Sequence, residues 1–349
     1  MCKETGMIVR QISILCMGLI LVSAVGCHSI HSGAVRDLIH PCLNRMECLI
    51  VKGHSSNRLR GPPMLFKASM EVLKVKYGSK EAADRFCHSL KTTGFAVLTE
   101  HPIPGELVNR VYQQWAEFFN SQEKHHYKYK PESQAGYFPF RSENAKDYNI
   151  KDLKEFFHIY PRSEMPEYLK KDTWDLYHRL VGLGAELLTW IQDSSPNEIK
   201  KLFSIPLQDM ITHSEENLLR VIHYPPLQGN EEKGAIRAAA HEDINLITLL
   251  CSATTPGLEV MDTAGNWHVV PCDPGSIAIN AGDMLQMASQ SFYKSTTHRV
   301  MNPAGPEAQK PRYSMPLFLH PRGDVKLSAD TTAGAYLKQR LLEIGLLKK

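Results

Sequence analysis

The second half of the chain carries many short apolar segments, and this pattern constrains the fold more than any other feature. From Leu218 onward, short runs rich in Val, Ile, Leu and Tyr are interrupted by Gly, Pro and Asp. Such runs predict short strands joined by turns, and many in succession are typical of a β-sandwich or barrel. The predicted strands are LLRVIHY, INLITLL, GLEVM, WHVVP, SIAIN, MLQMA, HRVMN and RYSMPLFL.

The residues before this region predict mainly helices. Residues 104–127 form one expected helix, and 173–192 form another because leucines recur there every three or four residues. A short strand is expected at Phe95–Leu98, after a helix that ends at Gly94. The segment GAYLKQRLLEIGLL predicts a last helix. We therefore expect one folded unit, with a helical region at 66–205 and a β core with a C-terminal helix at 206–349.

Residues 1–65 do not share this patterning and are expected to form an N-terminal extension. Ile12–Gly26 is a continuous apolar run behind Lys3 and Arg10, too short for a comfortable membrane span. It resembles the apolar region of a signal peptide, and the following Cys27 gives a loose likeness to a lipoprotein cleavage site. The alternative is a non-native start without a role, followed by a linker at 28–65.

Net charge and cysteine content indicate which binding partners and which cellular compartment to expect. The net charge is +3, which argues against a dedicated nucleic-acid binder, because such proteins usually carry a strong basic stripe. The cysteines at 87, 251 and 272 lie in apolar surroundings and predict buried free thiols. We therefore expect the folded unit in the cytoplasm, without a stable membrane span, unless the apolar segment 12–26 exports or anchors it. The sequence does not reveal the oligomeric state.

Two His-x-Asp/Glu motifs occur in the chain. With 16 His and 37 acidic residues in 349, about 1.7 such motifs are expected by chance, so the motif alone proves nothing. His213 and Glu215 lie in a polar stretch, which favours a solvated loop. His241 and Asp243 stand at the entry to the apolar run INLITLL. Residues i and i+2 of a strand face the same side, so this pair is expected to point into one cavity.

A third ligand is available on another predicted strand. His298 follows Asp243 by 55 positions, in STTHRVMNP. Two histidines and one carboxylate can occupy one face of an octahedral Fe(II) ion and leave the other face open for substrates and O₂. The alternative for a single histidine on a strand is a satisfied core residue.

Arg312 and Ser314 also stand two residues apart, in PRYSMP, and are expected to share a strand face. A buried arginine needs an anion, and a guanidinium binds a carboxylate through two parallel hydrogen bonds. Tyr224, at the end of LLRVIHYPP, can add a hydroxyl group. The alternative for Arg312 is a structural salt bridge.

The ordered set of motifs resembles the iron- and 2-oxoglutarate-dependent oxygenases of the isopenicillin N synthase-like type. TTGFAVLTEHPIP, DLKEFFHI, LRVIHYPP, HEDINLITLL, INAGDML, STTHRVMNP and RYSMPLFLHP carry the likeness, which spans most of residues 70–346. The resemblance implies a distorted double-stranded β-helix, or jelly roll, flanked by helices. It implies that His241, Asp243 and His298 bind iron. It also implies that Arg312 and Ser314, with Tyr224 assisting, bind the distal carboxylate of 2-oxoglutarate.

The implied reaction is oxidation of a small organic substrate by Fe(II), O₂ and 2-oxoglutarate, with release of succinate and CO₂. It covers hydroxylation, desaturation and ring closure. Three alternatives remain open: fragmentation of 2-oxoglutarate to ethylene, an iron oxidase that uses no oxo acid, and a metal-free binding protein on the same fold.

Three positions depart from residues that are common in the family. Ile222 makes the pocket wall more apolar, Glu242 stands where threonine is usual, and Thr297 stands where leucine is commoner. Ile222, Ile244 and Asn245 are the candidates for contact with the substrate, whose identity the sequence does not reveal.

Overall fold

The computed structural model describes residues 70–145 and 149–346. These residues belong to one compact unit, Ala68–Lys349. The predicted N-terminal extension, with its apolar segment 12–26, lies outside the described residues. Within those residues, no helix is both long and apolar enough to cross a membrane.

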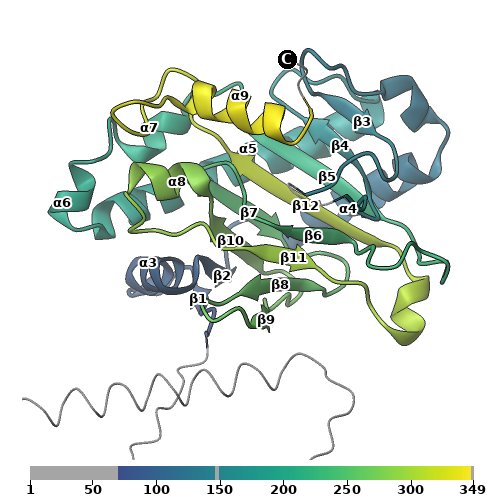
Figure 1. Ribbon diagram of the computed structural model, residues 1–349, viewed down its shortest axis with the longest axis horizontal. Coiled ribbons are helices and arrows are strands. Elements are labelled where there is room, and N and C mark those ends of the chain that lie inside the picture. The colour runs from purple at the N-terminus through teal and green to yellow at the C-terminus, as the bar shows by residue number, and fades with distance from the viewer. Residues whose placement is uncertain (1–69, 146–148, 347–349) are drawn as a thin grey trace, which may run out of the picture. The chain divides into compact units, whose positions relative to one another are not determined.

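Two sheets form the core, as the succession of short strands predicted (Figure 1). The large sheet has eight strands in the order β1-β2-β10-β7-β12-β5-β4-β3, and the small sheet has four in the order β6-β11-β8-β9. The strands are β1 (Lys74–Lys76), β2 (Phe95–Thr99), β3 (Gly136–Phe138), β4 (Glu155–Ile159), β5 (Leu218–Tyr224), β6 (Ala238–His241), β7 (Ile247–Cys251), β8 (Leu258–Met261), β9 (Trp267–Val269), β10 (Ile277–Ala281), β11 (His298–Val300) and β12 (Arg312–Leu319).

Both edges of the large sheet are built from the first part of the described chain. Strands β1 and β2 extend one edge beside β10, and β4 and β3 extend the other beside β5. The sequence predicted only β2 among these four. Strands β1 and β3 have three residues each, too few to show an alternating pattern. The sheet therefore joins the two regions that patterning alone had separated near residue 205.

Two layers of apolar side chains cover the two faces of the large sheet. On the inner face, Ile222 and Tyr224 of β5 pack with Val260 of β8 and Val300 of β11, so one core lies between the two sheets. On the outer face, β7 and β12 pack against helix α5 (Glu167–Ser194), and Leu249 and Leu319 are among the buried residues there. This arrangement is the distorted jelly roll flanked by helices that the family resemblance implied.

The helices include the two long ones that the sequence predicted. Leu176, Leu180, Leu183, Leu187 and Ile191 of the longest helix are at most 4% exposed, which confirms the periodic apolar face. The helices are α3 (Ala82–Thr93), α4 (Gly105–Asn120), α5 (Glu167–Ser194), α6 (Asn197–Lys200), α7 (Leu207–Ile211), α8 (Asp283–Ala288) and α9 (Ala333–Glu343), with 3-10 turns η1 (Glu123–Tyr127) and η2 (Gly305–Gln309).

The strand predicted for MLQMA is wrong, because these residues form most of helix α8. Its buried residues are Met284, Leu285 and Ala288, which recur at helical spacing. A five-residue apolar run does not distinguish a strand from a short helix, and here the helical spacing decided the outcome.

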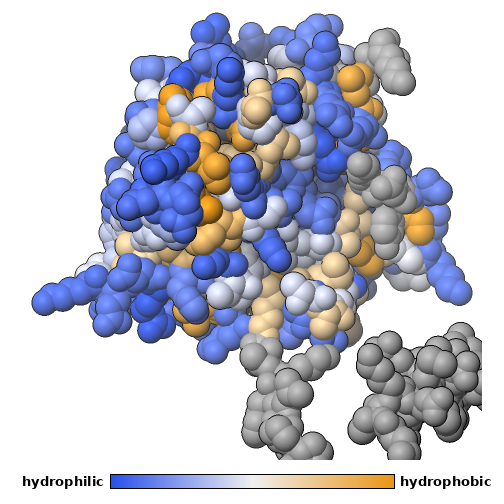
Figure 2. Space-filling model, turned by 60° about the vertical axis from the view of Figure 1, so that its left-hand side comes forward, coloured by the Kyte–Doolittle hydropathy of each residue, from blue (hydrophilic) through white to orange (hydrophobic). Residues whose placement is uncertain are grey.

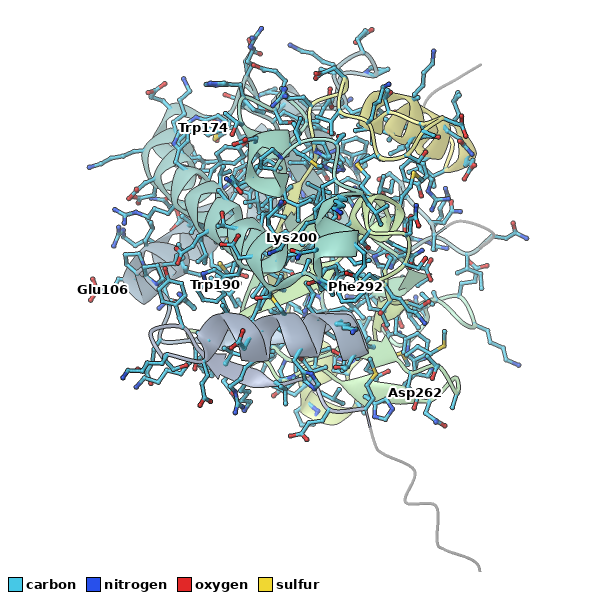
Figure 3. All side chains as sticks on the ribbon, turned by 90° about the vertical axis from the view of Figure 1, so that its left-hand side faces the viewer. Glu106, Trp174, Trp190, Lys200, Asp262 and Phe292 are labelled. Carbon is cyan, nitrogen blue, oxygen red and sulfur yellow. The ribbon has the colours of Figure 1, made fainter. Side chains whose placement is uncertain are left out.

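Aromatic side chains connect helix α3 to its neighbours (Figure 3). The Phe86 ring of α3 meets the Trp190 ring of α5 edge to face, with centroids 5.8 Å apart. Near the other end of α3, the Lys91 ammonium lies 4.2 Å from the centre of the Phe292 ring. The face that Figure 2 shows is mostly hydrophilic, with scattered apolar areas.

Two glycines of α5 offer a matched test of how closely this helix packs on the sheet. A Cβ added at Gly184 would collide with Leu319 and lie 3.3 Å from Leu249, whereas one at Gly182 meets nothing within 4 Å. Leu319 is fully buried. We expect Gly184→Ala to lower the free energy of unfolding by roughly 1–3 kcal/mol through overpacking. Gly182→Ala is expected to raise it by about 1 kcal/mol through helix propensity. Urea unfolding measures both, and a stabilising Gly184→Ala would contradict the close packing.

Candidate metal centre

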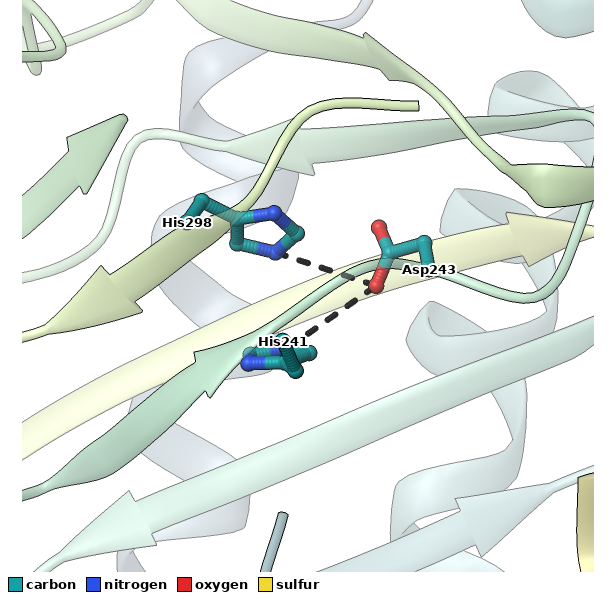
Figure 4. A group of neighbouring side chains, drawn as sticks. All are labelled: His241, Asp243 and His298. Carbon is teal, nitrogen blue, oxygen red and sulfur yellow. Dashed lines mark ion pairs between the residues drawn. The ribbon is translucent and has the colours of Figure 1, made fainter. Parts of the chain in front are cut away.

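The structure brings His241, Asp243 and His298 together between the two sheets (Figure 4). One potential ligand atom from each lies within 4.8 Å of the others. The Asp243 Oδ1 atom lies 4.0 Å from His241 Nε2 and 3.8 Å from His298 Nε2. Three donor atoms therefore converge on one point.

The route by which Asp243 reaches this point differs from the expected one. Strand β6 ends at His241, and Asp243 lies in the following loop rather than on the same strand. The alternation rule for strands therefore does not explain why the two side chains converge. The loop itself is held in place, because the Asp283 backbone N–H donates a hydrogen bond of 2.7 Å to the Asp243 carbonyl.

Both histidines are oriented by the backbone. His241 and His298 are directly paired on the neighbouring strands β6 and β11. His241 Nδ1 lies 2.7 Å from the Ala239 carbonyl oxygen, and His298 Nδ1 lies 3.1 Å from the Thr296 carbonyl oxygen. A carbonyl only accepts, so each Nδ1 carries the proton and each Nε2 keeps a free lone pair. The two lone pairs face Asp243, as metal ligands require.

The two oxygen atoms of the Asp243 carboxylate have different partners. Its Oδ2 atom accepts hydrogen bonds from Thr248 Oγ1 at 2.5 Å and Asn280 Nδ2 at 2.7 Å. Its Oδ1 atom remains directed at the two imidazoles. Burial opposes ionisation, but His298, His241 and these two hydrogen bonds together lower the pKa of Asp243. The group is therefore a carboxylate at neutral pH.

The electrostatics of His241 also favour ligation. Burial and the adjacent His298 lower the pKa of His241 to about 4. Its imidazole is therefore neutral at physiological pH, which is the form that binds metals. Two imidazoles and one carboxylate form the facial donor set of mononuclear non-haem iron oxygenases.

A cavity of about 850 Å³ opens beside this centre and reaches His241 and Asp243. Its wall includes Phe318 from β12 and Tyr336 and Leu337 from α9. A second group of lining residues, which we call the charged wall, consists of Glu143, Asp152, Lys154, His158 and Arg220. The cavity is large enough for a small organic molecule and presents both apolar and polar surface to it.

The charged wall is internally paired. Lys154 Nζ lies 2.8 Å from carboxylate oxygens of both Asp152 and Glu143, and Arg220 Nη1 lies 3.1 Å from Glu143. Although burial opposes it, the positive charges of Arg220 and Lys154 hold the pKa of Glu143 far below its usual value. Asp152 also accepts a 3.0 Å hydrogen bond from the Ala239 backbone N–H, so the wall is tied to strand β6 next to His241.

The sequence did not predict this ion-pair network. The segment DLKEFFHI supplied a family likeness and contains Asp152 and Lys154, but nothing in it indicates that Glu143 and Arg220 complete the network.

The candidates for substrate contact have different positions. Ile244 lines the cavity. Asn245 is fully buried and donates hydrogen bonds to the Ile247 carbonyl and the Thr248 hydroxyl. It therefore stabilises the loop after β6 that carries Asp243. Ile222 is buried in the core between the sheets, and neither it nor Asn245 lines the cavity wall. His213 is exposed and does not join the group of ligand atoms.

Arg312, Ser314 and Tyr224 gather on the inner face of the large sheet. Arg312 of β12 is directly opposite Tyr224 of β5, and its guanidinium carbon lies 5.0 Å from the centre of the Tyr224 ring. Ser314 follows on the same strand face, opposite Ile222. Arg312 is 1% exposed, yet among the described residues no carboxylate lies within ion-pair distance of it. Its Nε donates to the Thr255 carbonyl at 3.0 Å, and its Nη1 has no partner. The structural salt bridge considered for Arg312 is therefore absent from the described part of the chain.

Two of the departures from common family residues contact each other. The Thr297 hydroxyl donates a hydrogen bond to the Glu242 carboxylate. These residues adjoin His298 and His241, so the contact joins strands β6 and β11 beside both imidazoles. Nothing in the sequence indicates that these two positions are related in space.

Comparisons with known proteins agree with this geometry. The family model of the 2OG-Fe(II) oxygenase superfamily matches residues 215–321, and that of the N-terminal region of the non-haem dioxygenase in morphine synthesis matches residues 70–177. The crystal structure of a protein from Shewanella oneidensis, assigned as an oxygenase, is 48% identical, covers 79% of this chain and 100% of that one, and has a TM-score of 0.72. A 2OG-Fe(II) oxygenase family protein of Caulobacter crescentus is 30% identical over 78% of this chain and 99% of its own, with a TM-score of 0.66.

A third structure carries ligands. It is that of a full-length Neurospora crassa protein in complex with alpha-KG and thymine, which is 25% identical, covers 78% of this chain and 96% of that one, and has a TM-score of 0.64. This chain belongs to the 2OG-Fe(II) oxygenase superfamily. It is an Fe(II)- and 2-oxoglutarate-dependent dioxygenase, and its cofactors are Fe(II), 2-oxoglutarate and O₂.

A buried histidine of the cavity wall predicts a pH dependence of stability. Burial lowers the pKa of His320 to about 4, whereas an unfolded histidine titrates near 6.5. Below about pH 6.5 the unfolded chain gains a proton that the folded protein does not accept until about pH 4, so stability falls with pH across this window. For one histidine the loss is about 3 kcal/mol. The free energy of unfolding of metal-free protein is measured with urea at pH 7 and pH 4. Between these two pH values, His320→Gln should lose about 3 kcal/mol less of this free energy than wild type does. The exposed His213→Gln is the control, and equal losses in all three proteins would contradict the prediction.

Proposed function

We propose that His241, Asp243 and His298 hold one Fe(II) ion in this oxygenase. The observation that carries the proposal is the convergence of His241 Nε2, His298 Nε2 and Asp243 Oδ1 within 4.8 Å, next to a cavity. The donor set fits this ion, because two imidazoles and a carboxylate on one face leave positions for an oxo acid and O₂. Bound Fe(II), with 2-oxoglutarate and O₂, supplies the oxidising power and releases succinate and CO₂.

We further propose that Arg312, Ser314 and Tyr224 bind the distal carboxylate of 2-oxoglutarate. The unpartnered Nη1 of a buried guanidinium supports this role, because a buried cation without an anion is costly. Arg312 and the hydroxyl groups of Ser314 and Tyr224 lie on one sheet face, which supplies a bidentate donor and two further hydrogen-bonding groups.

The proposed substrate is a small polar organic molecule. The charged wall of Lys154, Glu143 and Arg220 offers hydrogen-bonding groups, while Phe318 and Leu337 offer apolar contact. The reaction is hydroxylation, desaturation or ring closure at a C–H bond presented to the metal. In this role the protein positions that bond and limits the access of water, and helix α9 supplies part of the enclosing wall.

The test is a screen for substrates by co-substrate turnover. Purified protein with Fe(II), ascorbate, O₂ and 2-oxoglutarate is incubated with panels of small polar metabolites, and succinate, CO₂ and ethylene are measured. We expect a substrate to raise succinate formation well above the uncoupled rate, with oxidised product in equal amount. His241→Ala serves as the inactive control. Ethylene as the main product, or no succinate under any condition, would overturn the proposal.

We also propose that the folded unit works in the cytoplasm and takes small molecules rather than nucleic acid. Cys87 and Cys251 are free and buried, and burial raises their thiol pKa values to about 11 and about 12. Such thiols are typical of a reducing compartment. Cell fractionation tests this, and recovery of the mature protein in a membrane or secreted fraction would contradict it.

A further inference from the structure

A second buried arginine lies beside the proposed oxo-acid site. Arg237 directly precedes strand β6, four positions before His241, and is 1% exposed. Its guanidinium carbon lies 5.9 Å from the centre of the Tyr224 ring, the same ring that Arg312 approaches to 5.0 Å. One arginine directly precedes strand β6 of the small sheet, the other belongs to β12 of the large sheet, and both approach one tyrosine.

Neither guanidinium is paired with an anionic side chain in the part of the chain that the structure describes. Arg237 Nη2 donates to the Lys310 carbonyl at 3.2 Å, whereas its Nε and Nη1 are buried without a partner. Arg312 Nη1 and the nearby Thr255 hydroxyl are likewise buried and unpartnered. Within residues 70–145 and 149–346 no carboxylate forms an ion pair with either arginine. Four buried polar atoms without partners therefore belong to the two arginines that flank Tyr224 and to Thr255, whose carbonyl binds Arg312.

The charges of the two arginines also oppose each other. Burial and the positive charge of Arg312 lower the pKa of Arg237 to about 10, so it remains charged at neutral pH. Two buried like charges without an anion destabilise a protein unless a ligand supplies the missing charge. A carboxylate between them would accept from several donors at once and satisfy both cations.

We infer that Arg237 is a second binding residue for the distal carboxylate of the oxo-acid co-substrate, acting with Arg312. This inference rests on the proposed function and deepens it. It makes the site selective for 2-oxo acids that end in a second carboxylate, because a neutral end would leave two cations unpaired. The rival explanation is structural, in which Arg237 serves only to bind the Lys310 carbonyl.

The experiment compares two oxo acids that differ only at the far end. Anaerobic calorimetry measures binding of 2-oxoglutarate and of 2-oxopentanoate, which has a methyl group in place of the distal carboxylate, to protein loaded with Mn(II). We expect Arg237→Met to weaken the binding of 2-oxoglutarate roughly tenfold to a hundredfold, because one partner of a buried charge pair is removed. Binding of 2-oxopentanoate should change by less than about threefold. Arg179→Met, which removes an exposed arginine paired with Asp175, should change neither affinity.

Thermal unfolding distinguishes a binding role of Arg237 from the rival, purely structural role. Because Arg237→Met removes an uncompensated buried cation, the ligand-free melting temperature should stay level or rise, while the increase produced by 2-oxoglutarate should shrink. A lower ligand-free melting temperature with an unchanged ratio of the two affinities would overturn the inference. If Arg237→Met is insoluble, Arg237→Lys takes its place. It keeps the charge without the fork and should retain only part of the preference for 2-oxoglutarate.

The same measurements distinguish a wrong role for Arg237 from a wrong location of the whole co-substrate site. If wild-type protein does not bind 2-oxoglutarate, or if Arg312→Ala binds it as well as wild type does, the co-substrate site itself is wrongly placed. If wild type binds it, Arg312→Ala does not, and Arg237→Met keeps the wild-type ratio, only the role of Arg237 is overturned.

Discussion

Asp243→Ala is expected to abolish turnover of 2-oxoglutarate and the binding of Fe(II). The substitution removes the Oδ1 atom that faces both imidazoles, and it leaves the two histidines without the carboxylate charge that balances a divalent cation. His241→Ala should have the same effect. Iron content after anaerobic reconstitution and the rate of succinate formation measure the outcome, with about one Fe(II) per chain expected for wild type.

Two further variants sharpen this prediction. Thr248→Val removes one of the two hydrogen bonds to Asp243 Oδ2 but replaces none of the three proposed ligands, and it should weaken iron binding by about 10- to 100-fold. His213→Ala changes the histidine of the other His-x-Glu motif, which is exposed, and should leave iron content and activity unchanged. Full activity in His241→Ala would refute the assignment of the ligands.

Arg312→Ala is expected to raise the concentration of 2-oxoglutarate needed for half-maximal turnover by orders of magnitude. The distal carboxylate would lose its bidentate donor while remaining desolvated, at a cost of roughly 2–5 kcal/mol. Fe(II) binding should be nearly unaffected, because Arg312 does not contact the three ligands. Arg312→Lys should recover only part of the affinity, since an ammonium does not form the planar fork. Initial rates across a range of 2-oxoglutarate concentrations measure each variant.

The fold of the ligand-free protein provides the control for this prediction. Arg312 has no carboxylate partner among the described residues, so its loss should not unfold the chain. An Arg312→Ala variant that melts far below wild type, with an unchanged requirement for 2-oxoglutarate, would show that the arginine is structural.

The parts of the fold that could be predicted are those in which a pattern repeats over several residues. The face of α5 follows from its leucines, and β5, β7 and β12 follow from apolar runs bounded by turn residues. Strands β1 and β3 are too short to carry a pattern. In the run MLQMA, five residues fit both a strand and a helix, and only packing against the core distinguishes them.

At the candidate metal centre, the three predicted residues lie together as expected. The reason given for the approach of His241 and Asp243 was wrong. The strand rule placed His241 and Asp243 on one face, but β6 ends between them. Asp243 is positioned instead by Thr248, Asn280 and Asp283, two of which lie about forty residues further along the chain. No local pattern reveals such contacts.

Arg237 was missed although the sequence holds a signal for it. The residue stands in AIRAAAH, between apolar neighbours that predict burial, and a buried arginine implies an anion. What the sequence does not show is that Arg237 and Arg312, 75 positions apart, meet at Tyr224.

The attachment of helix α9 has a consequence for how this oxygenase admits and releases molecules. Only Ala333 of the helix is buried. Backbone hydrogen bonds from Ala333 and Gly334 to the Val325 and Gly323 carbonyls hold its first turn. Further along, its contacts include a 2.8 Å hydrogen bond from the Tyr336 hydroxyl to Asp283 and the looser approach of Arg340 to the same carboxylate. Segments with few buried contacts open by local unfolding at a free energy well below that of the whole domain. The wall of the cavity can therefore detach and reclose while both sheets, and the donor atoms they carry, stay intact. Hydrogen exchange along the chain should accordingly show two tiers, a fast one in α9 and a slow one in β7 and β12.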